Sequence, residues 1–195
     1  MSANPAEVVL VGYQDQGNLG MGYLAAVLRQ HGHTVDLVDV HDEPVEIAAR
    51  LSGRQPLVVG FSLIFQAFLP QFRRAASHLR SAGVRCHFTI GGHFASLCHK
   101  ELLTNFPELD SVVRYEGEHT LLELVERLKA GENWRDVHDT VYMDGGRVVE
   151  TEARALVAEL DSLPFPHRPN DADRLGGFYT LPLLASRGCA RRCSF

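Results

Sequence analysis

Five short apolar segments alternate with amphipathic segments over the first 130 residues, and this alternation is what most constrains the fold. The apolar segments are expected to be strands at 8–12, 34–40, 57–61, 84–90 and 111–115. Helices are expected at about 19–28, 44–51, 65–81, 95–105 and 118–130. Regular strand–helix alternation predicts a doubly wound, Rossmann-like α/β fold with a parallel five-stranded sheet and right-handed crossovers. The flavodoxin-like strand order 2-1-3-4-5 suits five such units, although the pattern alone does not set the order.

The pattern changes after Gly131. Asp144, Gly145 and Gly146 separate two β-branched segments, which predicts a β-hairpin. Three prolines within 163–169 exclude a helix and predict a stiff linker, and a further strand is expected at 179–185. We therefore expect three parts: a first domain at 1–135, a hairpin and linker at 136–175, and the start of another domain at 176–195.

The composition excludes several classes of protein. Of the 195 residues, 45% are hydrophobic and 22% are charged, which is typical of a globular domain and not of a disordered chain. The net charge of −5 argues against a nucleic-acid binder. No apolar segment approaches the roughly 20 residues of a membrane span, and the first residues do not resemble a signal peptide. A reducing, cytoplasmic location is expected, where spaced cysteines indicate metal binding or catalysis more often than disulfides.

A ligand site is expected beyond the carboxyl ends of the parallel strands. Four loops lie there, at 13–20, 62–66, 91–96 and 115–119, and three of them carry glycine. Glycine lets the backbone approach a ligand closely, so the four loops together predict a rim for a large, flat ligand.

A dinucleotide is one candidate ligand. The first loop contains Gly17, Gly20 and Gly22, and Asp39 ends the second predicted strand. However, the spacing is Gly-x-x-Gly-x-Gly, whereas dinucleotide-binding folds use Gly-x-Gly-x-x-Gly. A dinucleotide-binding Rossmann domain is therefore kept as an alternative.

A corrinoid is the second candidate, because four segments resemble a known family. They are NLGMGYLAAVLR at 18–29, VGFSL at 59–63, IGGHFAS at 90–96 and YEGE at 115–118. They look like the cobalamin-binding domain of cobalamin-dependent radical S-adenosylmethionine (SAM) enzymes. The resemblance covers about residues 8–130 and rests on the order of the four segments and their places on the rim.

The resemblance implies a role for each part of the rim. Ser62, with Leu63 beside it, would hydrogen-bond the nucleotide tail of cobalamin, and Gly91 and Gly92 would leave room for that tail. His93 would contact the corrin or its tail, with plain solvent exposure an equal alternative. Glu116 and Gly117 would border the tail. The residues beneath the corrin ring would be Tyr13, Gln14, Asp15, Gln16, Gly17, Asn18, Leu19 and Gly20.

One departure from corrinoid proteins concerns the cobalt ligand. Proteins that ligate cobalt use Asp-x-His-x-x-Gly after the first strand, and here Asp15 and Gly20 match while Gly17 stands at the histidine position. Glycine offers no imidazole, so the lower face of cobalt would be empty, bound by water, or contacted by Gln14 or Gln16. Radical SAM relatives often lack this histidine, whereas methyl carriers have it.

The last residues resemble a second motif of the same family. Radical SAM enzymes bind a 4Fe–4S cluster and SAM through Cys-x-x-x-Cys-x-aromatic-Cys, and Cys189, Cys193 and Phe195 match its first three positions. Cys189 and Cys193 are thus expected metal ligands, and the third cysteine would be residue 196. Two cysteines do not supply the cluster, so we expect this chain to be part of a longer enzyme and inactive in radical chemistry alone.

The resemblance implies an activity for the whole enzyme. A reduced cluster would cleave SAM to a 5′-deoxyadenosyl radical, and methylcobalamin would methylate an unactivated carbon of a small-molecule or natural-product substrate. An electron donor would reduce the cluster. Some relatives use cobalamin for ring closure or contraction, and a non-catalytic corrinoid carrier or sensor module is an alternative of another class.

Residues outside these motifs are expected to be structural. Cys86 is expected to be a small buried hydrophobe, and His33 to lie at the surface. Cys98 and His99 are adjacent on a predicted helix and so do not face one metal ion. No residue of this chain is assigned a catalytic role.

Overall fold

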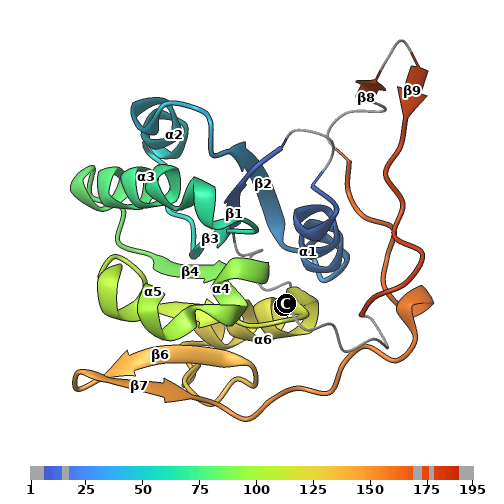
Figure 1. Cartoon of the computed structure of the whole chain (residues 1–195). Helices are drawn as coiled ribbons and strands as arrows, with labels where there is room; N and C mark the ends of the chain where they lie inside the picture. Colours follow the sequence, from blue (N-terminus) through green and yellow to red (C-terminus); the bar gives the residue numbers. More distant parts are fainter. Residues whose placement is uncertain (1–6, 15–17, 169–172, 176–177, 189–195) are drawn as a thin grey trace.

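The computed structural model describes residues 7–14, 18–168, 173–175 and 178–188. Its main feature is a seven-stranded sheet in the order β2-β1-β3-β4-β5-β6-β7, with helices on both faces (Figure 1). The strands of this sheet are β1 (Glu7–Gly12), β2 (Thr34–Asp39), β3 (Val58–Ser62), β4 (His87–Gly91), β5 (Ser111–Val113), β6 (Thr140–Asp144) and β7 (Arg147–Glu150). The helices are α1 (Leu19–Gln30), α2 (Pro44–Leu51), α3 (Leu69–Ser81), α4 (His93–Leu97), α5 (His99–Asn105) and α6 (Gly117–Ala130), with 3-10 turns at Gln66–Phe68 and Leu160–Ser162.

The first five strands are parallel to one another, and their order confirms the flavodoxin-like prediction. Their apolar sequences follow from burial on both faces, since Val8, Val9, Leu10 and Val11 of β1 are all at most 2% exposed. Val8 and Leu10 pack with α1 and α6, while Val9 and Val11 pack with α2, α3 and α5. The sheet therefore separates two hydrophobic cores.

The hairpin is part of the main sheet. β6 pairs antiparallel with β5, where Ser111 lies opposite Tyr142, and β6 then pairs with β7. The sequence predicts the hairpin but not its partner, because the turn residues determine only the local connection. The five predicted parallel strands thus continue into two antiparallel ones.

Three elements of the parallel domain differ most from the predicted boundaries. β4 begins at His87 and not at 84, because the Arg80 guanidinium donates hydrogen bonds to the carbonyl oxygens of Val84 (3.3 Å) and Cys86 (2.8 Å). The helix expected at 95–105 is two helices, α4 and α5, which meet at Cys98, where φ is −117°. The helix expected at 65–81 starts as a 3-10 turn, and α3 begins at Leu69 with proline in its first turn, where the missing N–H costs nothing.

The strand expected at 179–185 is shorter than predicted. β9 (Phe178–Thr180) pairs antiparallel with β8 (Asp173–Leu175), and residues 181–188 are in neither helix nor strand. A strand needs a neighbour for its backbone hydrogen bonds, and no described segment pairs with 181–185.

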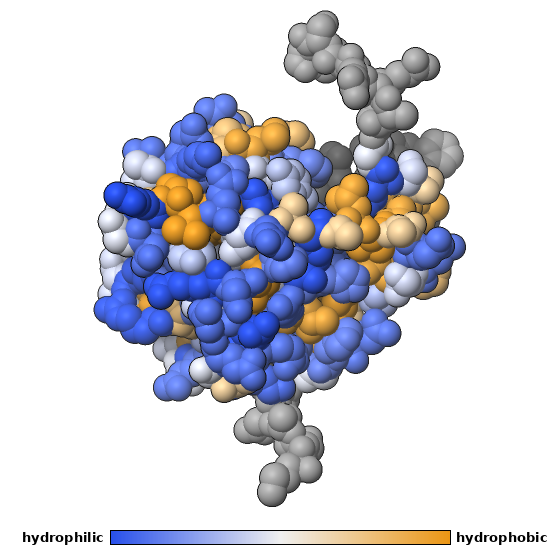
Figure 2. Space-filling model, turned by 90° about the horizontal axis from the view of Figure 1, so that it is seen from below, coloured by the Kyte–Doolittle hydropathy of each residue, from blue (hydrophilic) through white to orange (hydrophobic). Residues whose placement is uncertain are grey.

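The molecular surface is largely hydrophilic with hydrophobic patches between (Figure 2). Leu97, Leu156 and Leu183 are among the exposed large apolar side chains of the described chain, at 79%, 70% and 78% exposure. None of the described helices has the length and hydropathy needed to cross a membrane.

Candidate functional site

A cavity of about 870 Å³ opens at the carboxyl ends of the parallel strands. It lies over β1, β3, β4 and β5 on the face of the sheet that carries α1 and α6, so both helices contribute to its walls. The strand order reverses here, because β2 and β3 lie on opposite sides of β1. Such a topological switch point is where open α/β sheets bind ligands.

The floor of the cavity is one row of the sheet. Leu10, Gly60 and Thr89 are register partners across β1, β3 and β4, and all three line the cavity. A Cβ on Gly60 would lie 2.9 Å from the Leu10 side chain, so glycine keeps this row low. The Thr89 hydroxyl accepts a hydrogen bond from Ser111 Oγ (2.8 Å) beneath the floor.

The loop after β4 requires glycine at one position. Gly92 has a φ of +101°, and a Cβ there would lie 2.5 Å from the carbonyl oxygen of Leu63. Leu63 in turn donates its backbone N–H to the Gly91 oxygen (2.8 Å), so the ends of β3 and β4 are fixed together. The close approach leaves the two loops as one continuous edge of the cavity.

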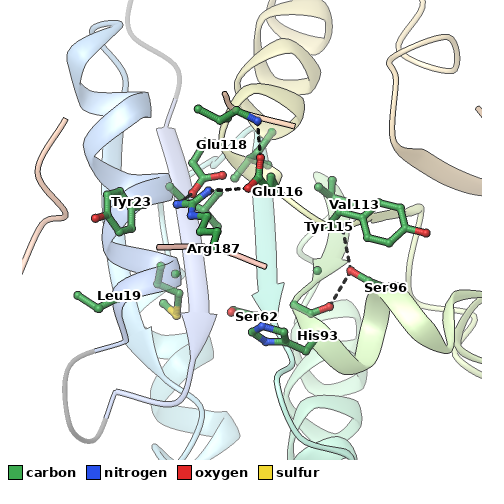
Figure 3. Close-up of a pocket in the computed structure, with 18 of the residues that line it drawn as sticks. Leu19, Tyr23, Ser62, His93, Ser96, Val113, Tyr115, Glu116, Glu118 and Arg187 are labelled. Atoms are coloured by element: carbon green, nitrogen blue, oxygen red, sulfur yellow. Dashed lines mark hydrogen bonds and ion pairs between the residues drawn. The ribbon is translucent and has the colours of Figure 1, made fainter. Parts of the chain in front are cut away.

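Ser96 links that edge to the next loop. Its hydroxyl donates to the Gly92 oxygen (2.9 Å) and accepts from the Tyr115 backbone N–H (2.8 Å; Figure 3). Tyr115 has a φ of +54°, which is unusual for a bulky residue. The bond from Ser96 helps to hold the chain in this turn at the start of α6.

A charged corner closes one side of the cavity. Arg187 lies between Glu116 and Glu118 at the start of α6 and the Tyr23 ring of α1 (Figure 3). Burial acts to lower the pKa of Arg187, but the bonds to Glu118 and Glu116 raise it above its ordinary value. The guanidinium therefore stays charged.

Two late segments of the chain cover the cavity. Leu156, Val157, Ala158 and Leu160 line it from one segment, and residues 184–188 line it from another. The first segment is fastened where the Val157 N–H donates to Glu116 Oε2 (2.6 Å), and the second where Arg187 meets the same carboxylate. Apart from the charged corner, these segments add mostly apolar surface.

Eight of the sequence-predicted site residues line the cavity: Leu19, Gly20, Ser62, Gly91, Gly92, His93, Glu116 and Gly117. The remaining described ones lie outside its lining. Tyr13 stacks on Phe68 and contacts His41, and Asn18 caps α1 by accepting from the Met21 N–H (3.1 Å). Leu63 is buried beneath Gly92, and Gln14 is bonded to the Met21 sulfur (3.5 Å).

Six predicted residues fall outside the described part of the chain: Asp15, Gln16, Gly17, Cys189, Cys193 and Phe195. The expectations for the cobalt ligand and for the iron–sulfur ligands thus stay predictions.

The structure adds lining residues that no motif had marked as site residues. They are Leu10, Met21, Tyr23, Leu24, Gly60, Phe61, Thr89, Ser96, Leu97, Val113, Tyr115, Glu118, Leu121 and the two covering segments. Ser96, Tyr115 and Glu118 fall within the predicted rim loops, so their position was available from the pattern. Leu10, Gly60 and Thr89 required the strand register, which the sequence does not provide.

Residues 7–125 match the family model described as the B12 binding domain. The chain belongs to this family. B12 is cobalamin, so the family match agrees with the resemblance of the rim loops to those of cobalamin-binding domains.

Curated relatives match along nearly the whole chain. A hopanoid C-3 methylase from Methylococcus capsulatus is 34% identical over 187 residues, which are 91% of this chain and 35% of that protein. An uncharacterized methyltransferase from Pyrococcus horikoshii is 27% identical, covering 91% of this chain and 39% of that protein. An anaerobic magnesium-protoporphyrin IX monomethyl ester cyclase from Cereibacter sphaeroides is 26% identical, with 90% and 30% covered. The chain thus spans less than half the length of these relatives.

Among solved structures, the cobalamin-dependent SAM radical enzyme OxsB, with aqua-cobalamin and SAM bound, superposes with a TM-score of 0.70. It is 25% identical, and the match covers 84% of this chain and 24% of that one. The resemblance to cobalamin-dependent radical SAM enzymes is thereby confirmed.

The cavity fits a group with the shape of cobalamin. Its volume of about 870 Å³ is at the upper end of that of ligand pockets. Gly91 and Gly92 let the loop after β4 lie close to its neighbours, because a Cβ would lie 3.1 Å from the Val113 oxygen and 2.5 Å from the Leu63 oxygen. Mostly apolar walls with one charged corner suit a large macrocycle whose edge carries polar amides.

Proposed function

We propose that this chain is the cobalamin-binding part of a radical SAM enzyme. The observation that carries the proposal is the cavity between α1 and α6. It opens where the strand order of the sheet reverses, in a chain that belongs to the B12 binding domain family. Ser62, Gly91, Gly92, His93, Glu116 and Gly117 would hold the cofactor from the strand ends, and Leu19 and Gly20 from α1.

The chain's own residues have three tasks in this proposal. The sheet floor and the fixed loops after β3 and β4 give the cofactor one position. The covering segments exclude water from it, because Leu156, Val157 and Leu160 are apolar. When bound, cobalamin supplies a carrier of methyl groups, and the protein supplies position and surroundings.

For the whole protein we propose methylation of an unactivated carbon in a small-molecule or natural-product substrate. Two of the relatives are named as methylating enzymes, and Cys189 and Cys193 suit the first two ligands of a 4Fe–4S cluster that binds SAM. Such a cluster needs an electron donor and a reducing setting, as in the cytoplasm. A cyclisation is the second candidate, because the Cereibacter relative is named as a cyclase.

The decisive experiment is to incubate the purified chain with hydroxocobalamin, desalt it and record the visible spectrum. We expect the corrinoid bands to elute with the protein, and a titration with NADH to show no binding. A colourless protein would contradict the proposal, and NADH binding in its place would favour the dinucleotide alternative.

A pair of serine variants tests where the cofactor lies. Ser62→Leu places a bulky side chain at the cavity, whereas Ser52→Leu places it at the exposed end of α2. We expect at least tenfold weaker retention of hydroxocobalamin for Ser62→Leu and no change for Ser52→Leu, with far-UV circular dichroism confirming that both fold. Equal retention by the two variants would show that the ligand lies elsewhere.

A further inference from the structure

The charged corner contains one carboxylate oxygen that the protein does not use. Glu118 is only 5% exposed, and its Oε1 accepts from Arg187 Nη2 at 2.6 Å. Its Oε2 is buried and has no hydrogen-bond partner among the described residues. A buried acceptor without a hydrogen bond costs free energy, so a ligand that donates a hydrogen bond to this oxygen would be favoured.

The other oxygens of the corner are occupied. Glu116 Oε2 accepts from the Val157 N–H (2.6 Å), and Glu116 Oε1 lies 3.5 Å from Arg187. Of the described buried polar atoms that lack a partner, Glu118 Oε2 is the one that belongs to a residue lining the cavity.

Arg187 determines where this oxygen points. The guanidinium holds Glu118 Oε1 and lies 5.1 Å from the Tyr23 ring centroid, with its side chain 18% exposed. A carboxylate held by one oxygen has little freedom at the other. Figure 3 shows Glu118 and Arg187 at the same end of the cavity, between α1 and α6.

We propose that Glu118 Oε2 accepts a hydrogen bond from a primary amide on the edge of the corrin ring, and that Arg187 is the residue that positions it. The inference rests on the proposed function, because it assumes a corrinoid in the cavity. The edge of cobalamin carries acetamide and propionamide arms, whose N–H groups are the donors that a buried carboxylate lacks.

The same geometry makes Glu118 a selector of corrinoids. An amide arm donates to the carboxylate, whereas a carboxylate arm, as in biosynthetic precursors of cobalamin, is repelled by it. The corner holds two carboxylates against one guanidinium, so its charge does not favour an acidic arm. A charge-assisted hydrogen bond of this kind is worth roughly tenfold or more in affinity.

The test compares two corrinoids that both lack the nucleotide tail. Cobinamide carries amides on its arms, and cobyrinic acid carries carboxylates, so the ratio of their dissociation constants reports on the ring edge alone. In the unmodified chain we expect cobinamide to bind more tightly. Glu118→Gln should weaken cobinamide binding and reduce the preference roughly tenfold, because the repulsion of carboxylates is removed. Arg187→Gln should weaken cobinamide binding, because Glu118 loses the contact that positions its Oε2. It should weaken cobyrinic acid binding more and so increase the preference, because a negative charge is left without its partner.

Glu101→Gln is the matched control. It removes one exposed carboxylate from α5, outside the cavity, and should leave the preference unchanged. A purely structural role of Glu118 would weaken both ligands equally and leave the ratio unchanged, which would overturn the inference. Failure of the unmodified chain to bind hydroxocobalamin would overturn the proposed function itself. A circular dichroism spectrum checks the fold of each variant, and the Arg187 variant gives a second reading of opposite sign.

Discussion

His87 lies at the start of β4, where its ring meets Ser111 and Trp134. Its Nε2 is 2.8 Å from Ser111 Oγ, and the ring centroids of His87 and Trp134 are 4.7 Å apart. Because the Ser111 hydroxyl donates to Thr89, the histidine Nε2 must donate to Ser111, which a neutral ring can do. A polar chain thus runs from the hairpin side to the cavity floor.

Burial lowers the pKa of His87 from 6.5 to about 4. The unfolded chain binds a proton below pH 6.5, whereas the folded chain does so only near pH 4. The free energy of unfolding should therefore fall as pH drops from about 6.5 to 4, by roughly 3 kcal/mol from this residue. Urea unfolding at pH 7.5, 5.5 and 4.5 measures this, and His87→Gln should flatten the dependence.

His78→Gln is the control for that measurement, since His78 is exposed near the end of α3. It should leave the pH dependence as in the unmodified chain. If His87→Gln and the unmodified chain lose stability in parallel, burial of His87 is not the cause.

At the scale of residues, the sequence indicates where chemistry-bearing side chains lie better than what they contact. The glycines at the end of β4 were expected at a ligand site, and they line the cavity. His33 was expected at the surface, yet it is 4% exposed and its Nε2 lies 2.6 Å from Glu126 Oε1. Its partner Glu126 lies on α6, far along the chain, and no local sequence pattern predicts this contact.

The hairpin β6–β7 is an element whose attachment depends on one buried arginine. Arg114 follows β5 and is 8% exposed in its side chain. It donates to Glu150 Oε2 (2.9 Å) and to the Thr151 oxygen (3.0 Å), and it lies 3.6 Å from the buried Asp139. These contacts join the parallel sheet to its antiparallel extension.

Arg114→Met should lower the free energy of unfolding by roughly 3 kcal/mol, because it leaves buried acceptors without their donor. Hydrogen exchange followed by mass spectrometry should show faster exchange at β6 and β7 than in β1 or β3. Arg147→Met, at an exposed position of the same hairpin, should change neither. Unchanged exchange at β6 and β7 in the Arg114 variant would mean that backbone pairing alone holds the hairpin.

At the scale of elements, apolar periodicity was sufficient for the parallel strands and the helices between them. It did not show that α4 and α5 separate at Cys98, nor that Arg80 uses the carbonyls before β4. It also did not predict the partner of the hairpin. Each of these depends on contacts between segments far apart in sequence, which period and propensity do not encode.

At the scale of the whole molecule, the largest surprise is how much of the cavity comes from the chain after the hairpin. Residues 156–158, 160 and 184–188 line it, although none of them was predicted to be a site residue. Their place is set by long-range bonds such as that of Val157 to Glu116. The sequence therefore predicts the rim of the site, but neither its floor nor its cover.

The linker that leads away from this cover is fixed on α1 at a glycine. The His167 N–H donates to the Gly22 oxygen (2.9 Å), and a Cβ on Gly22 would lie 2.6 Å from the His167 oxygen. Gly20 lies two residues earlier, and a Cβ there would have its nearest neighbour, Asn18 Oδ1, at 3.4 Å. Both glycines lie in the first turn of the same helix, so the two positions differ mainly in whether the linker packs against them.

Gly22→Ala should therefore displace the linker, whereas Gly20→Ala should not. Replacing glycine by alanine within a helix normally stabilises by roughly 0.5–1 kcal/mol, and we expect this gain for Gly20→Ala only. Gly22→Ala should lower the thermal midpoint and speed hydrogen exchange of the His167 amide, because its acceptor moves away. A rise in the midpoint for both variants, with His167 still protected, would show that the linker yields without cost and that α1 does not determine its path.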